Sequence, residues 1–134
     1  MLGQSSVSNL IAGVDSEVQG VVSFSGAWNL LGTTTEEQDY YIDALLANDT
    51  PEARYLASPV YQISRHSPPV LIFHGTDDKL IPFQQSKYAC EIYASKGLDY
   101  CFLVPLEGST HCLDEDPEFF FISIRNFLNW WLIQ

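Results

Sequence analysis

Three apolar runs recur along the chain, separated by longer stretches with a different periodicity. The runs are residues 18–24, 70–74 and 100–104, and they are rich in Val, Leu, Ile and Phe. Apolar runs of this length, bounded by turn residues such as Ser25-Gly26, are typical of buried β-strands. The pattern therefore predicts three strands.

The longest connection, residues 27–63, predicts two short helices. Residues 33–37 offer capping-box pairs and are followed by apolar side chains at helical spacing up to residue 46. Pro51 then opens a second helix that reaches about residue 56. The first of these helices is acidic and rich in tyrosine, so we expect it either to cap a site or to shield the sheet.

Two further helices follow the second and third strands. The first is expected over residues 84–96, where Gly97 is a C-terminal stop. The last begins at Asp116-Pro117 and runs to about residue 133. Apolar residues cover more than one face of this last helix, so we expect it to be well buried on the sheet.

Strands that alternate with helices connect through right-handed crossovers into a parallel sheet. The order of elements therefore predicts the α/β class, with a parallel sheet of about three strands flanked by helices. A chain of 134 residues is expected to form at most one domain.

Composition excludes several classes of partner. Seventeen acidic residues against six basic ones give a net charge of −11, whereas nucleic-acid binding relies on basic patches. The same charge argues against adsorption to an anionic membrane, and no apolar run approaches the roughly 20 residues of a membrane span. Met1 is not followed by the basic and apolar regions of a signal peptide, so the compartment stays open.

Three cysteines, Cys90, Cys101 and Cys112, match no zinc-binding or redox spacing. We expect ordinary buried or half-buried thiols, with one disulfide as the alternative. No metal or organic cofactor is predicted.

Candidate catalytic side chains follow the places where strands end. Asp78 follows the second strand, His111 follows the third, and Gly3-Gln4-Ser5 opens the chain. The carboxyl ends of parallel strands share one edge of a sheet, so these residues are expected to converge. A serine nucleophile needs a base and a carboxylate that orients the base. Ser5, Asp78 and His111 therefore form a predicted catalytic triad, in the chain order of α/β-hydrolases.

Three local motifs carry a resemblance to a known family. Gly3–Ala12 resembles the nucleophile motif G-x-S-x-G-G-x-L-A, His74–Pro82 resembles H-G-x-x-D-x-x-V-P, and Gly108–His111 resembles G-x-x-H. Together they resemble the C-terminal half of an α/β-hydrolase, similar to the acetyl-esterase, feruloyl-esterase-like and prolyl-oligopeptidase-like carboxylesterases.

This resemblance implies a serine hydrolase that cleaves small carboxylic esters. It implies that residues 1–134 are the C-terminal part of one catalytic domain, with Ser5 as nucleophile, His111 as general base and Asp78 as the orienting acid. It also implies that the Ser6 N–H belongs to the oxyanion hole. Trp28 is expected either to wall a substrate pocket or to lie in the core. His74 is expected to brace its loop.

Two departures from the family pattern leave alternatives open. Val7 stands where the nucleophile motif has Gly, and the nucleophile strand and early oxyanion loop are not in the sequence. We therefore expect a fragment of a longer enzyme, whose strand at residues 18–24 is an exposed edge open to self-association or to a second chain. The rival functions are a prolyl-oligopeptidase-type peptidase and a non-catalytic remnant.

Overall fold

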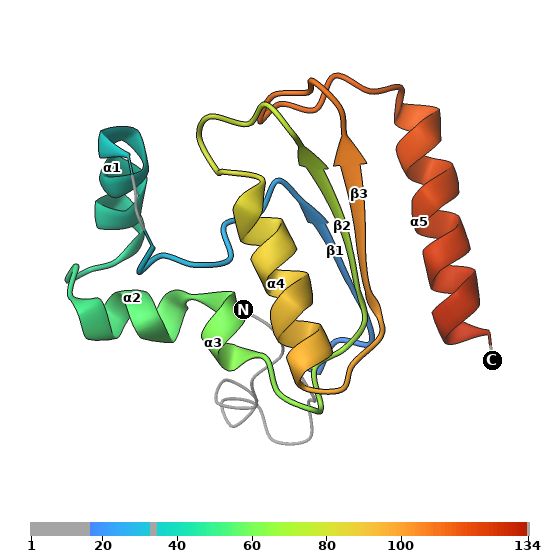
Figure 1. Ribbon diagram of the computed structural model, residues 1–134, viewed down its shortest axis with the longest axis horizontal. Helices are drawn as coiled ribbons and strands as arrows, with labels where there is room; N and C mark the ends of the chain where they lie inside the picture. Colours follow the sequence, from blue (N-terminus) through green and yellow to red (C-terminus); the bar gives the residue numbers. More distant parts are fainter. Residues whose placement is uncertain (1–16, 33–34, 134) are drawn as a thin grey trace.

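The computed structural model describes residues 17–32 and 35–133. Within them lies one parallel sheet of order β1-β2-β3, formed by β1 (Val21–Phe24), β2 (Val70–Gly75) and β3 (Cys101–Leu106). Phe24 lies opposite Phe73, and Phe73 lies opposite Val104, so the carboxyl ends of the strands meet at one edge of the sheet (Figure 1). The predicted α/β class and three-stranded parallel sheet are confirmed.

Five helices accompany the sheet in the described part of the chain. They are α1 (Glu36–Leu45), α2 (Pro51–Ala57), α3 (Pro59–Gln62), α4 (Gln84–Ser95) and α5 (Pro117–Leu132). The capping box of α1 forms between Thr35 and Gln38 rather than within residues 33–37, because the Gln38 side chain accepts from the Thr35 N–H. The short helix α3 was not predicted; it starts at Pro59, directly after α2.

Both faces of β2 are covered, and the strand is buried along its whole length. Val70 and Ile72 pack with Ala89 and Tyr93 of α4 on one face. On the other face Leu71 and Phe73 form a second cluster that includes Phe127 of α5. Figure 1 shows α4 and α5 on opposite sides of the sheet. Each such buried side chain contributes roughly 1.5–3 kcal/mol of transfer free energy, so β2 is the centre of the core.

The prediction that α5 is well buried was wrong. Phe127 is its only fully buried residue, whereas Phe121 is 65% exposed and Trp130 is 46% exposed. A three-stranded sheet offers one face to this helix, so in the described residues its other sides meet solvent.

Strand β1 forms the edge of the sheet that sequence reasoning predicted. Among the described residues it pairs only with β2, and Phe24 at its end is 49% exposed. An open, apolar strand edge is a template for pairing with another chain. Self-association through this edge stays a prediction.

Two of the three cysteines form the disulfide that the sequence left as the alternative. Cys90 of α4 is bonded to Cys101 of β3, with the two Cα atoms 5.3 Å apart, and Cys112 is a free, exposed thiol. The bond ties α4 to the beginning of β3, at the end of the sheet opposite the carboxyl ends of the strands. In the described residues no helix combines the length and apolarity that crossing a bilayer would take.

Candidate active site

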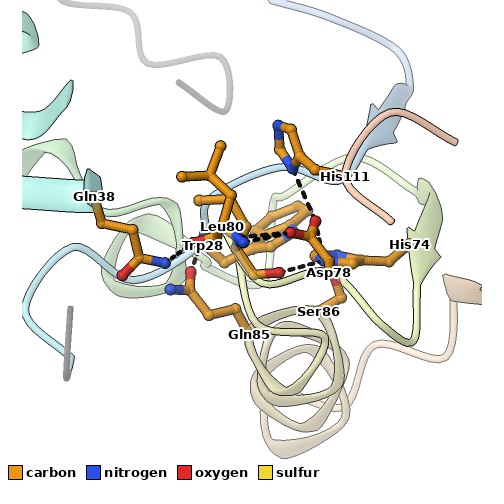
Figure 2. A network of polar contacts seen from close by, with 9 residues as sticks. Trp28, Gln38, His74, Asp78, Leu80, Gln85, Ser86 and His111 are labelled. Carbon is orange, nitrogen blue, oxygen red and sulfur yellow. Dashed lines mark hydrogen bonds and ion pairs between the residues drawn. The ribbon is translucent and has the colours of Figure 1, made fainter. Parts of the chain in front are cut away.

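The loop after β2 carries Asp78, whose side chain is fully buried and surrounded by donors. Oδ1 accepts from the backbone N–H groups of Leu80 and Ile81, at 2.9 and 2.8 Å. Oδ2 lies 2.8 Å from Nδ1 of His111 (Figure 2). An aspartate that accepts from backbone N–H groups two and three residues on forms its own turn. The local sequence therefore fixes the carboxylate before His111 reaches it.

His111 arrives from the loop after β3, and its side chain is 40% exposed. With Asp78 accepting at Nδ1, that nitrogen carries the proton, and Nε2 has the lone pair that a general base needs. Figure 2 shows the far edge of the ring directed away from Asp78. Nδ1 of His111 is thus held at Asp78, and Nε2 points away from it.

Gly75 allows the two loops to approach each other this closely. A Cβ at this position would lie 2.2 Å from the carbonyl oxygen of Ser109 and 2.6 Å from that of Thr110. In the present arrangement the Asp77 N–H donates to the Ser109 oxygen at 3.0 Å. Only a residue without a side chain fits here, so Gly75 sets the separation between Asp78 and His111.

His74 braces the loop from below, as the sequence predicted. Its ring is fully buried; Nε2 lies 2.8 Å from the Ile81 carbonyl oxygen and Nδ1 lies 2.6 Å from Oγ of Ser86 (Figure 2). The carbonyl can only accept, so Nε2 carries the proton and Nδ1 accepts from the serine hydroxyl. Nε2 also lies 3.2 Å from Oδ2 of Asp78. Because its ring is buried and both its nitrogens are engaged, His74 supports the acid rather than acting as a second base.

A cavity of about 550 Å³ lies beside His111. Its walls come from the turn after β1, from α1, from the loop that follows Asp78, and from α4. The lining residues are Ser25, Ala27, Asn29, Leu30, Gln38, Tyr41, Ile42, Leu45, Leu80, Ile81, Gln85 and His111. The size is that of a small-molecule site, and most of the lining side chains are apolar.

Backbone strain is found near the carboxyl ends of the strands, where Asp78 and His111 also lie. Ser25, directly after β1, has a φ of 46°, and Leu113, two residues after His111, has a φ of 50°. These are the non-glycine residues with a left-handed backbone among those described. Such conformations cost of order 1–3 kcal/mol and cluster at functional sites.

Trp28 lies in the core, one of the two places expected for it, and does not line the cavity beside His111. It is 4% exposed and packs in the core with Val60 and Ile63. The backbone N–H groups of Trp28 and Asn29 donate to Oε1 of Gln85, at 2.8 and 3.0 Å (Figure 2). The indole packs in the core, and its neighbours Ala27 and Asn29 line the cavity instead.

Ser5 and Ser6, the predicted nucleophile and oxyanion donor, lie outside the described residues. Gln38 and Gln85 were missed by sequence reasoning, since each acts on backbone groups more than 40 residues away. The place of Gln38 in the capping box can be recognised from its neighbours in the sequence, but its hydrogen bond to the Leu80 carbonyl oxygen cannot.

Among the described residues no group of three or more His, Cys, Asp and Glu side chains could hold a metal ion.

The parallel sheet, with an acid after one strand and a histidine after the next, defines an α/β-hydrolase. The sequence model of the BD-FAE family matches residues 5–92. The chain belongs to the BD-FAE family.

Similar proteins share this class. The chain is 27% identical over 114 residues to esterase LipC of Mycobacterium tuberculosis, covering 80% of this chain and 28% of that protein. A truncated carbohydrate esterase from gut microbiota superposes with a TM-score of 0.70 at 22% identity, covering 86% of this chain and 43% of that one. Propionate-bound esterase 2 of Thermogutta terrifontis superposes with a TM-score of 0.62 at 22% identity, over 90% of this chain and 43% of that one. The chain thus spans less than half of each of these relatives.

Proposed function

We propose that the chain is the C-terminal catalytic part of a longer serine esterase that cleaves small carboxylic esters through a Ser-Asp-His triad and an acyl-enzyme. The observation that carries this proposal is the 2.8 Å contact between Oδ2 of Asp78 and Nδ1 of His111, beside a cavity of ligand size. In this proposal residues 1–134 are the C-terminal part of a single catalytic domain. Membership of the BD-FAE family supports the reaction class.

The proposed reaction begins at Ser5. Its hydroxyl gives a proton to Nε2 of His111 while Oγ bonds to the ester carbonyl carbon, and the Ser6 N–H donates to the oxyanion. As the tetrahedral intermediate collapses, the bond to the alcohol oxygen breaks and that oxygen takes the proton from Nε2. Water then gives a proton to the same nitrogen while its oxygen bonds to the acyl carbon. When this second tetrahedral intermediate collapses, the bond to Ser5 Oγ breaks and Oγ takes the proton from Nε2, which releases the carboxylic acid and restores Ser5 and His111.

The role of Asp78 in this sequence is positional and electrostatic. It holds the His111 ring with Nδ1 protonated, and its negative charge stabilises the imidazolium that forms in each half of the reaction. The donors from Leu80 and Ile81, together with the His74 ring behind it, keep the carboxylate in one place. A fixed acid suits a reaction in which one histidine accepts a proton and gives it up again twice.

The substrate class follows from the cavity and from the relatives. The cavity is lined mainly by apolar side chains and suits a small organic ester. One relative is an esterase by name, and esterase 2 of Thermogutta terrifontis holds propionate in one structure and butyrate in another. Small aliphatic esters are therefore the substrates to test first.

Hydrolysis of 4-nitrophenyl butyrate tests this proposal, with Ser5→Ala and Ser6→Ala as a matched pair of variants. We expect the wild-type chain to turn over, Ser5→Ala to lose all turnover above background, and Ser6→Ala to retain it, since a backbone N–H survives side-chain truncation. A folded wild-type chain that leaves the ester intact would show a non-catalytic remnant. Cleavage of succinyl-Gly-Pro nitroanilide in preference to the ester would show a peptidase.

A further inference from the structure

Helix α1 contacts the rest of the described chain through few inward side chains. Gln38 and Ile42 are its only buried residues, and Figure 1 shows the helix set apart from the sheet. On its outer side, a guanidinium nitrogen of Arg54 lies 3.0 Å from a carboxylate oxygen of Asp39. Partly exposed ion pairs of this kind are worth about 0–1 kcal/mol, so the inward residues chiefly determine how α1 is held.

Gln38 makes two contacts that point in opposite directions. Its Oε1 accepts from the Thr35 N–H at 3.0 Å, which closes the cap of its own helix. Its Nε2 donates to the carbonyl oxygen of Leu80, in the loop that carries Asp78 (Figure 2). The Leu80 N–H in turn donates to Oδ1 of Asp78 at 2.9 Å. A single residue, Leu80, therefore links α1 to the acid.

The cavity beside His111 is enclosed by these same two elements. Tyr41, Ile42 and Leu45 of α1 form one wall, and Leu80 and Ile81 form another. Apart from His111, none of the described residues that line the cavity is an Asp, Glu, Lys or Arg. An anionic or cationic group would lose part of its hydration here without finding a side chain of fixed opposite charge, so the cavity favours a neutral, apolar group.

We propose that Gln38 is a positioning residue that latches α1 to Leu80, and that the wall it holds selects a neutral, apolar arm of the ester. The arm is an alkyl or aryl group larger than methyl, on either the acyl or the alcohol side of the ester. This inference rests on the proposed function, because it assigns the substrate arm of the same site. Gln38 acts through α1 and touches no reacting atom.

Gln38→Glu separates the two contacts of this side chain. A carboxylate still accepts from the Thr35 N–H and preserves the cap, but it has no donor for the Leu80 carbonyl. Tyr40→Glu is the matched control, because it adds the same charge to α1 at a side chain that is 71% exposed and does not line the cavity. Circular dichroism of both variants checks that α1 stays folded.

The substrates are ethyl acetate, ethyl hexanoate and hexyl acetate, followed in a pH-stat. Lengthening the acyl arm in one ester and the alcohol arm in the other shows which side enters the cavity. The dissociation constant of N-hexylhexanamide, an amide that the enzyme is not expected to cleave, is measured in parallel by calorimetry. It reports binding even if the chain hydrolyses nothing.

We expect wild type to prefer one hexyl ester over ethyl acetate. Gln38→Glu should raise the KM for that ester and the Kd of the amide by about fivefold to tenfold, the equivalent of one lost hydrogen bond. The kcat and the KM for ethyl acetate should stay within about twofold, as should every value for Tyr40→Glu. If Gln38→Glu lowers the helix content, Tyr41→Ala replaces it and should raise the amide Kd about threefold.

The outcomes separate this inference from the proposed function. Amide binding that weakens in Gln38→Glu, in a chain that cleaves no ester, supports the latch and contradicts the esterase proposal. Ester hydrolysis with equal KM values in Gln38→Glu and Tyr40→Glu overturns the latch alone. A wild-type chain that neither binds the amide nor prefers a hexyl ester overturns it as well.

Discussion

The loop that carries Asp78 and the connection that lines the cavity differ in how firmly their side chains are held. The acid loop, residues 74–82, keeps both His74 and Asp78 buried, and every polar atom of these two side chains has a partner. The connection, residues 27–32 and 35–63 in the described chain, includes helix α1, which is exposed apart from two buried side chains. The acid loop is fixed by several converging contacts, whereas α1 within the connection is held mainly by single ones.

This difference matches the role proposed for each region. In the proposed reaction, proton transfer between His111 and the nucleophile tolerates errors of less than about 1 Å, so Asp78, which orients His111, must be placed by several contacts at once. A wall that sorts apolar groups contributes only about 1–3 kcal/mol per methylene, so it tolerates looser placement. Fold stability and catalytic geometry should therefore depend on the acid loop, and selectivity on the connection.

The largest expected effect comes from Asp78→Asn. An amide in this position favours the wrong His111 tautomer, and we expect the kcat for ester hydrolysis to fall by about 10⁴-fold. Asp77→Asn is the control, since Asp77 is the exposed neighbour in the same loop. Rates of 4-nitrophenyl butyrate hydrolysis measure both variants. Equal losses, or a loss in Asp77→Asn alone, would show that the acid has been assigned to the wrong residue.

Gly75→Ala should be the most destabilising single substitution in the acid loop. Its Cβ would overlap the Ser109 carbonyl oxygen at 2.2 Å, and backbone oxygens cannot turn away as a flexible side chain does. We expect a loss of about 3 kcal/mol in the free energy of unfolding, measured in urea. Gly32→Ala, where the nearest contact is 3.5 Å, should change it by less than about 1 kcal/mol. Similar midpoints for the two variants would argue against close contact between the loops.

Reducing the Cys90–Cys101 disulfide should cost about 2–3 kcal/mol, because the bond closes a short loop between α4 and β3. The acid loop contacts the same helix α4 through the hydrogen bond between His74 and Ser86, whereas neither cysteine of the disulfide lies in α1. Urea unfolding with and without dithiothreitol measures the effect, and Cys90→Ser/Cys101→Ser controls for Cys112. An unchanged midpoint would mean that the two cysteines are not paired in solution.

Tyr93→Phe should give the smallest effect, about 1 kcal/mol, by removing the hydrogen bond that its hydroxyl donates to the Pro68 carbonyl oxygen at 2.8 Å. Burial raises the pKa of the Tyr93 hydroxyl above the ordinary value near 10. A raised folded pKa gives stability that is complete below that ordinary value and is lost as the pH rises above it. Urea midpoints at pH 8 and pH 11 should show a smaller alkaline loss in Tyr93→Phe than in wild type.

Local patterns in the sequence were enough for the acid loop and for the sheet. Asp78 forms its own turn and follows an apolar strand, and both features are written within a few residues. The long-range contacts were not accessible in this way. Trp28 looked equally suited to a pocket or a core, and its burial depends on packing with Val60 and Ile63, which lie in a later part of the chain.

The exposed sides of α5 show a second limit. Its apolar residues predicted burial because hydrophobic periodicity reports what a helix is able to cover, not how much sheet is available to cover it. The described sheet covers it at Phe127 and leaves Phe121 at 65% exposure. Cysteine pairing was open for a related reason, since spacing alone does not show which strand and helix lie side by side.

The central claim is that Asp78 and His111 together activate Ser5. Labelling with a fluorophosphonate, followed by mass spectrometry of the modified peptide, tests it most directly because the probe reacts only with an activated hydroxyl. We predict that the label lies on Ser5 in the wild-type chain and that labelling slows by orders of magnitude in His111→Ala and in Asp78→Asn. A label on any other residue, or labelling of Ser5 at the same rate in all three proteins, would contradict the claim.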